Sequence, residues 1–272
     1  MQAVREADRD RYLAALYAPE DRREALFALY AFNAEVAGIR DRIREALPGE
    51  IRLQWWRDVI AGRPADGHPA AEALVEAIDR HGLPRAAFEN YLEARLFDLY
   101  DDPMPTRADL EGYCGETASA LIQLASLVLD PATAAAHGEA AGHAGCAQAI
   151  AGLLRVLPVH RRRGQCYVPQ DILAAAGTTV ADFLATTDHE ACERVVSAVT
   201  ALAREHLAAF GQAAALPPLL RPAYLPVALV PDYLGAVARR GVAGEGTADI
   251  PSWKRHWRLF RAATAAAGRP AD

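Results

Sequence analysis

The acidic, cysteine and histidine residues are the first candidates for catalysis or metal binding in this chain. The four cysteines stand singly and the histidines show no ligand spacing, so neither a zinc site nor a disulfide framework is expected. One acidic cluster is Asp98 with Asp101 and Asp102. Because two prolines follow closely, we interpret this group as a solvated helix end, with metal binding as the alternative.

A run of arginines is a second candidate site. Arg161, Arg162 and Arg163 directly follow His160. Guanidinium groups bind phosphate through paired hydrogen bonds, so this run could hold an anion such as a phosphate or a lipid head group. The alternative is a loop whose charges are solvated.

The C-terminal segment combines aromatic and basic residues. Trp253, Trp257 and Phe260 stand at positions i, i+4 and i+7 and share one face of a helix. The basic residues of the segment are Lys254, Arg255, Arg258 and Arg261. This composition is typical of a helix that lies in a membrane interface, so we expect membrane contact here. In the alternative, the aromatic rings pack on the protein and the charges face water.

Helices must position these residues, because apolar residues recur at three- and four-residue steps between proline and glycine breaks. We expect one long helix over Asp21–Ala46, ended by Pro48 and Gly49. Thr106 is the expected N-cap of another helix, and Gly241–Asp249 is expected to be a mobile loop. The glycines within 133–157 predict close helix packing. The remaining helices are expected over 51–60, 70–80, 85–100, 107–129, 133–157, near 171, 188–212, 223–240 and from 251 onward.

Composition supports an all-α protein. The chain has 272 residues and a net charge of −6, and its 52% hydrophobic fraction includes 60 alanines. Alanine and leucine favour helices, while the acidic balance argues against a nucleic-acid partner. No apolar run reaches the roughly 20 residues that span a bilayer, and no secretory signal is recognisable, so a cytoplasmic protein is expected. We expect one domain over 1–250, followed by a basic aromatic helix and tail over 251–272.

Four segments in order make the chain similar to a known family. Arg22–Asn33, Leu53–Arg57, Tyr113–Cys114 and Arg163–Pro169 resemble segments of the squalene/phytoene synthase family. The resemblance implies an isoprenoid-synthase-type helical bundle around a central cavity. The residues that it suggests for the cavity lining are Tyr30, Asn33, Trp56 and Arg155.

Active members of that family carry two aspartate-rich motifs, which hold the Mg²⁺ ions that neutralise a departing diphosphate. By resemblance, the first motif falls at Ala37, Gly38 and Asp41, and the second at Val156 and His160. Only one of these five residues is a carboxylate. Pro158 should also break the helix that presents the second motif. The family's cavity-lining glutamine and asparagine correspond to Ala149 and Gly152.

A more specific resemblance links the chain to the branch of the family that includes the mitochondrial assembly factor for respiratory complex I. It implies a pseudoenzyme without cofactor, which assists assembly of complex I (NADH dehydrogenase) and binds its subunits or assembly intermediates. Such a protein would lie peripherally on the inner face of the cytoplasmic membrane. Two alternatives remain: an active prenyl-diphosphate transferase that uses Mg²⁺, and a non-catalytic carrier of an isoprenoid or lipid.

Overall fold

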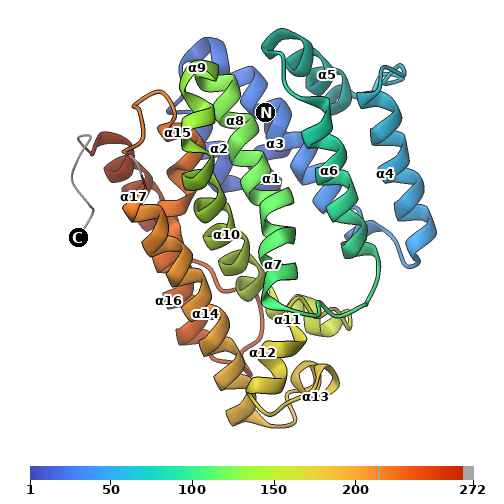
Figure 1. Cartoon of the computed structure of the whole chain (residues 1–272), viewed down its shortest axis with the longest axis vertical. Helices are drawn as coiled ribbons and strands as arrows, with labels where there is room; N and C mark the ends of the chain where they lie inside the picture. Colours follow the sequence, from blue (N-terminus) through green and yellow to red (C-terminus); the bar gives the residue numbers. More distant parts are fainter. Residues whose placement is uncertain (214, 266–272) are drawn as a thin grey trace.

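The structure is a computed structural model that describes residues 1–213 and 215–265. Within these ranges the backbone forms helices joined by turns and loops, and it contains no strand. Figure 1 shows the helices packed side by side in one bundle, with α10 among its neighbours near the centre. The all-α fold predicted from the sequence is confirmed.

Long helices run through the body of the bundle, and short helices and single turns connect them. The α-helices are α1 (Gln2–Ala7), α2 (Arg9–Ala15), α3 (Glu20–Ala37), α4 (Ala46–Ile60), α5 (Pro69–His81), α6 (Arg85–Arg95), α7 (Arg107–Cys114), α8 (Ala120–Leu129), α9 (Pro131–Ala134), α10 (Gly138–Arg155), α11 (Leu157–Arg162), α12 (Gln170–Ala175), α13 (Val180–Ala185), α14 (His189–Gln212), α15 (Arg221–Tyr224), α16 (Val230–Arg240) and α17 (Ser252–Thr264). The 3₁₀ helices are Arg40–Arg42, Leu96–Leu99, Ala135–His137 and Leu225–Leu229, and a π-helical turn covers Gly115–Ser119.

Helix α10 organises the core because it packs against α8, α14 and α16. Buried apolar side chains form two clusters, one built largely from α3 to α6 and α8, the other from α10, α14 and α16. In α3 the side chains of Leu26, Leu29 and Phe32 are completely buried. A helix that is apolar around most of its circumference belongs inside a protein, and α3 fits this rule.

The close packing predicted for the glycine-rich segment is confirmed at Gly145 in α10. A Cβ atom at this position would lie 2.3 Å from the backbone nitrogen of Ser119, far inside van der Waals contact. The Ser119 hydroxyl donates a 2.9 Å hydrogen bond to the Gly142 carbonyl oxygen across the same contact. A Cβ at Gly142 or Gly152 would meet no atom within 4 Å, so those glycines have no such packing role.

The single helix predicted over Asp21–Ala46 was wrong. Helix α3 ends at Ala37, and α4 begins at Ala46, with Pro48 as its third residue. Proline is tolerated there because the first backbone N–H groups of a helix have no acceptor within it. Gly49 follows in close contact with Leu99, whose Cδ2 would lie 2.6 Å from an added Cβ. The Pro–Gly pair therefore marks the beginning of a helix and not its end.

Two other local predictions are confirmed. Thr106 caps α7: its hydroxyl accepts a 3.3 Å hydrogen bond from the Asp109 amide, and the Asp109 carboxylate accepts from the Thr106 amide at 2.9 Å. Pro158 does interrupt the helix, because α10 ends at Arg155 and α11 begins at Leu157. The motif positions on either side of this break therefore belong to different helices.

The loop over Gly241–Asp249 was expected to be mobile, and the structure shows it anchored. Arg155 and Ala248 exchange two hydrogen bonds: Arg155 Nε donates to the Ala248 carbonyl at 3.1 Å, and the Ala248 amide donates to the Arg155 carbonyl at 3.1 Å. Arg161 donates to the carbonyl oxygen of Val242, which is itself buried. Arginines on α10 and α11 thus satisfy backbone groups of the loop, a role that its sequence does not reveal.

Candidate functional site

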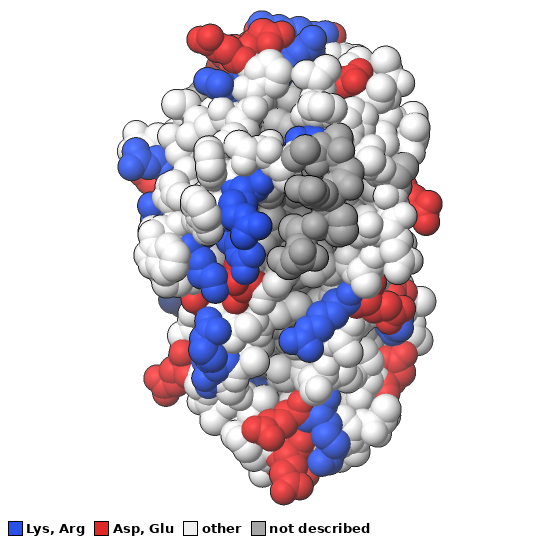
Figure 2. All heavy atoms as spheres, turned by 90° about the vertical axis from the view of Figure 1, so that its left-hand side faces the viewer, with Lys and Arg blue, Asp and Glu red and all other residues white. Residues whose placement is uncertain are grey.

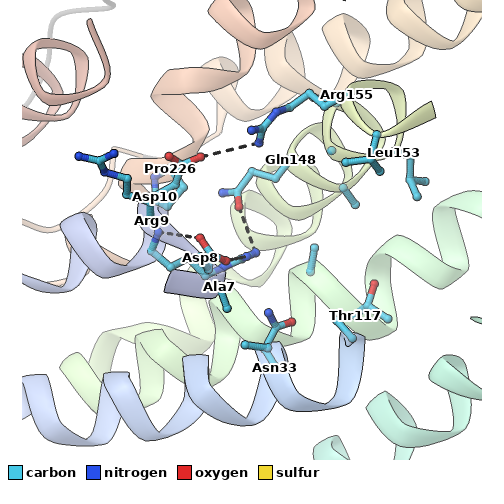
Figure 3. A pocket seen from close by; sticks show the side chains of 18 of the residues that line it. Ala7, Asp8, Arg9, Asp10, Asn33, Thr117, Gln148, Leu153, Arg155 and Pro226 are labelled. Atoms are coloured by element: carbon cyan, nitrogen blue, oxygen red, sulfur yellow. Dashed lines mark hydrogen bonds and ion pairs between the residues drawn. The ribbon is translucent and has the colours of Figure 1, made fainter. Parts of the chain in front are cut away.

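A cavity of about 820 Å³, partly open to solvent, lies in the bundle. Its wall is formed by the α1–α2 junction, the end of α3, α10, part of α16 and the loop before α17. Figure 3 shows side chains from these elements around a common space, with Asp8 and Asp10 beside Gln148 and Arg155 of α10. The cavity that the family resemblance implies is therefore present.

The positions of the first motif lie on the cavity wall, at the end of α3 and just beyond it. Ala37 and Gly38 line the cavity with no carboxylate, and Asp41 lines it from the 3₁₀ turn that follows. The Asp41 carboxylate forms an ion pair with Arg163, which comes from the loop after α11. The single acidic group retained at this motif therefore already has a cationic partner within the protein.

The second motif is split between the wall and the interior. Val156 lines the cavity at the junction of α10 and α11. His160 does not line it; its ring packs on Tyr167, with the ring centroids 4.6 Å apart. Burial lowers the pKa of His160 to about 4, so its imidazole is uncharged at neutral pH. Neither position offers a carboxylate to a metal ion.

The structure does not bring the three candidate anion-binding arginines together. Arg161 donates to the Val242 carbonyl and lies over the Phe183 ring, 4.7 Å from its centroid. Arg162 is exposed, and Arg163 is paired with Asp41. Successive residues of a short helix point in different directions, so their adjacency in sequence does not produce a shared site.

Two of the four residues suggested for the cavity lining are at the cavity. Asn33 and Arg155 line it, whereas Tyr30 and Trp56 are buried in the core instead. The Trp56 ring contacts Phe32 edge-on at 5.1 Å, and only 4% of Trp56 is exposed. The suggestion for Tyr30 and Trp56 needs correcting because α3 and α4 pack against other helices at these positions. Ala149 and Gly152 of α10 also line the cavity.

The N-terminal helices supply acidic groups that sequence reasoning missed. Asp8 caps α2 and forms an ion pair with Arg11 at 2.6 Å. Asp10 forms an ion pair with Arg255 of α17 at 2.6 Å and accepts a hydrogen bond from the Tyr233 hydroxyl at 2.6 Å. Burial raises the pKa of Asp10 above its usual value, although these neighbours oppose the shift. The only sequence signal was the alternation of acids and arginines over residues 8–11.

Asp249 completes the charged wall beside α17. Its carboxylate lies 2.8 Å from Arg255 and 3.4 Å from Arg155. The Arg155 guanidinium also stacks on the Tyr233 ring at 3.6 Å and lies 4.0 Å from Asp10. The four aspartates that line the cavity are thus each paired with arginine. In the described ranges, no three His, Cys, Asp or Glu side chains converge so that they could hold a metal ion.

The interpretation of Asp98 as part of a solvated helix end was wrong. Only 7% of Asp98 is exposed, and its carboxylate accepts hydrogen bonds from Tyr113 and Tyr167, each at 2.8 Å. Arg95 donates to the same carboxylate at 2.9 Å. A buried charge is stable only with such partners. Asp101 and Asp102 are exposed as expected, and Asp101 pairs with Arg40 at 3.1 Å.

In α17 the aromatic side chains face outward. This is the reverse of a helix that packs on the protein by its aromatic face. Trp253, Trp257 and Phe260 are exposed. The inward positions are occupied by the buried residues Arg255 and Leu259. The alternative in which the aromatic stripe packs on the protein therefore does not apply. The expected tail beyond residue 265 lies outside the described residues.

A helical bundle with a cavity between α3 and α10 defines the isoprenoid-synthase class of fold. A dehydrosqualene synthase crystal structure superposes with a TM-score of 0.81 over 96% of this chain and 93% of that chain, at 17% sequence identity. A squalene synthase from Alicyclobacillus acidocaldarius superposes with a TM-score of 0.72 over 88% and 92%, at 21% identity. The chain belongs to the squalene/phytoene synthase family, whose sequence model matches residues 4–261.

Relatives within the family include both assembly factors and synthases. Complex I assembly factor 6 of Bos taurus is 32% identical over 239 residues, which cover 86% of this chain and 71% of that protein. The Homo sapiens protein of the same name is 30% identical over 88% of this chain and 73% of its own length. The 15-cis-phytoene synthase of Synechococcus elongatus is 28% identical over 60% of this chain and 57% of that enzyme.

Proposed function

We propose that this chain is a catalytically inactive member of its family that assists the assembly of respiratory complex I. The observation that carries this proposal is the composition of the cavity wall. Ala37, Gly38 and Val156 stand where the family's enzymes place magnesium-binding carboxylates, and all three line the cavity. Similarity to complex I assembly factor 6, at 30–32% identity over most of the chain, supports the choice of target.

Electrostatics supports the loss of catalysis. Departure of a diphosphate requires Mg²⁺, which needs carboxylates free to coordinate it. Here Asp41 is paired with Arg163, and Asp10 is paired with Arg255. A metal ion at either place would have to displace a guanidinium from its carboxylate, and it would meet repulsion from that same cation. We infer that the cavity does not assemble a magnesium cluster.

We also infer that the chain works at the cytoplasmic face of the membrane that holds complex I. No helix in the described part of the chain is long and apolar enough to cross a membrane. Contact with subunits or assembly intermediates would then take place at the membrane surface.

A carrier of an isoprenoid or lipid is the second candidate function, because a cavity of about 820 Å³ is present although most carboxylates of the two aspartate-rich motifs are absent. A volume of this size lies within the usual range of small-molecule sites. Gly152 offers a way to separate the two functions. It lines the cavity, and an added Cβ would meet no atom within 4 Å, so Gly152→Phe would place a ring in the empty space.

The test is removal of the gene from its host, followed by native gels of membranes stained for NADH dehydrogenase activity. We expect loss of assembled complex I and an unchanged isoprenoid profile. Complementation with wild type, Gly152→Phe and Gly152→Ala should restore the complex equally. If only Gly152→Phe fails while its thermal stability is normal, the carrier function is favoured. If complex I is intact in the deletion strain, the assembly proposal is wrong.

A further inference from the structure

An exposed apolar surface lies where α17 meets the end of α2. Trp253, Trp257 and Phe260 are 71%, 54% and 50% exposed, and the last two rings stack with centroids 6.2 Å apart. Leu16 and Tyr17, at the end of α2, are 39% and 41% exposed. Single exposed apolar residues are ordinary, but several large ones on neighbouring elements indicate a binding surface.

A shallow groove of about 170 Å³ joins the two elements. Leu13, Leu16 and Tyr17 line it from the α2 side, and His256 and Leu259 line it from α17. Leu16 and Tyr17 thus border the groove, and the exposed rings lie on the same helix as His256 and Leu259. We call these exposed residues the aromatic face: Leu16, Tyr17, Trp253, Trp257 and Phe260.

Ion pairs on the inner side of α17 hold the aromatic face outward. Arg255 is 5% exposed and is paired with Asp10 and Asp249. Lys254 and Arg258 lie 2.7 Å from the two carboxylate oxygens of Asp232, which is also buried. The helix is therefore ordered before it meets any partner. Binding of α17 to a partner would therefore not include the entropic cost of folding a free segment.

The charge beside the aromatic face is positive, although the chain as a whole carries −6. Asp232 faces two cations, which leaves one positive charge in excess. Arg261 and His256 are exposed on the same helix. Figure 2 views the side of the molecule on which α17 lies: much of it is uncharged, several blue side chains border the uncharged area, and red side chains lie mainly toward the edges.

We infer that the aromatic face docks on the interface of an anionic lipid bilayer. Tryptophan and tyrosine rings favour the head-group region, where adjacent cations meet lipid phosphates. A second copy of the chain fits this surface less well, because a symmetric contact would place Arg261 and the excess cation against their own equivalents. Since three of the four basic residues of α17 are engaged within the protein, ring insertion should supply more of the binding than charge does.

The inference is tested with the full chain and vesicles of phosphatidylcholine with about one third phosphatidylglycerol. We expect co-sedimentation that falls only about tenfold between low and high salt, since few free charges take part. Brominated lipids should quench tryptophan fluorescence. The variant Trp253→Phe/Trp257→Phe should still bind but lose that quenching, because Trp55 and Trp56 lie on α4.

The decisive variant is Trp253→Ser/Trp257→Ser/Phe260→Ser, which should lower vesicle binding at least about tenfold. Its matched control is Leu47→Ser/Ile51→Ser on α4, which removes side chains that are 63% and 62% exposed on another element and should bind like wild type. Normal thermal melting of both variants excludes misfolding. The inference is overturned if wild type does not sediment, or if the triple variant binds unchanged. It is also overturned if the triple variant loses self-association or a protein contact instead of vesicle binding.

Discussion

Replacement of Arg255 should destabilise the whole protein, because this residue joins α17 to the cavity wall. Arg255→Met keeps the apolar stem and removes the guanidinium from two carboxylates, Asp10 at 2.6 Å and Asp249 at 2.8 Å. Loss of one partner from a buried ion pair costs about 3–5 kcal/mol, since the remaining charge has lost its compensation. Asp249 is half exposed, and Arg155 lies 4.0 Å from Asp10, so we expect a value near 3 kcal/mol.

Urea titrations of four proteins measure this effect: wild type, Arg255→Met, Asp10→Asn and the double variant. The double variant should lose less stability than the sum of the two single variants, with a coupling of about 1–3 kcal/mol. Arg261→Met is the control on the exposed side of α17 and should change the free energy of unfolding by about 0.5 kcal/mol or less. Equal losses in the free energy of unfolding for Arg255→Met and Arg261→Met would refute the reasoning. Such a result would mean that the Arg255 guanidinium is as solvated as that of Arg261.

Two further predictions concern His160 and the glycines of α10. The folded-state pKa of His160 is about 4, below the unfolded value of about 6.5, so protonation favours the unfolded state and stability should fall as the pH drops from 6.5 toward 4. His160→Gln should flatten this loss, which we expect to be about 2 kcal/mol by pH 5 in urea titrations, and unchanged slopes would contradict the burial argument. Gly145→Ala should cost about 1–3 kcal/mol because its Cβ would overlap a neighbouring backbone, whereas Gly142→Ala should be neutral or stabilising by up to about 1 kcal/mol. Similar melting temperatures for the two alanine variants would show that the helices separate easily.

The sequence predicted the helical class and most long helices, because periodicity and caps are local signals. Thr106 and Pro158 acted as expected, since capping and helix interruption depend on nearby backbone. The helix end predicted at Pro48 was wrong because proline is compatible with both the region after a helix and the first turn of the next one. The short helices α1 and α2 have too few turns to show a periodic pattern, so the acids that they bring to the cavity were missed.

The candidate site was less predictable because it depends on partners far apart in sequence. The sequence around Asp98 does not indicate its hydrogen bond with Tyr167, and the sequence around Asp10 does not indicate its ion pair with Arg255. The direction of α17 shows the same limit. Its aromatic and basic residues lie on one amphipathic helix, and the sequence does not show which side faces the protein. The basic side turns inward because basic residues of α17 pair with buried carboxylates such as that of Asp232.

We propose that the cavity no longer performs the diphosphate chemistry of its family. The most direct test is calorimetric titration of the full chain with farnesyl and geranylgeranyl diphosphate, with and without Mg²⁺, followed by analysis of released diphosphate. Because Ala37, Gly38 and Val156, which correspond by resemblance to metal-binding carboxylates of the family, line the cavity, we predict no magnesium-dependent heat and no release. Magnesium-dependent binding in the micromolar range together with diphosphate release would contradict the claim.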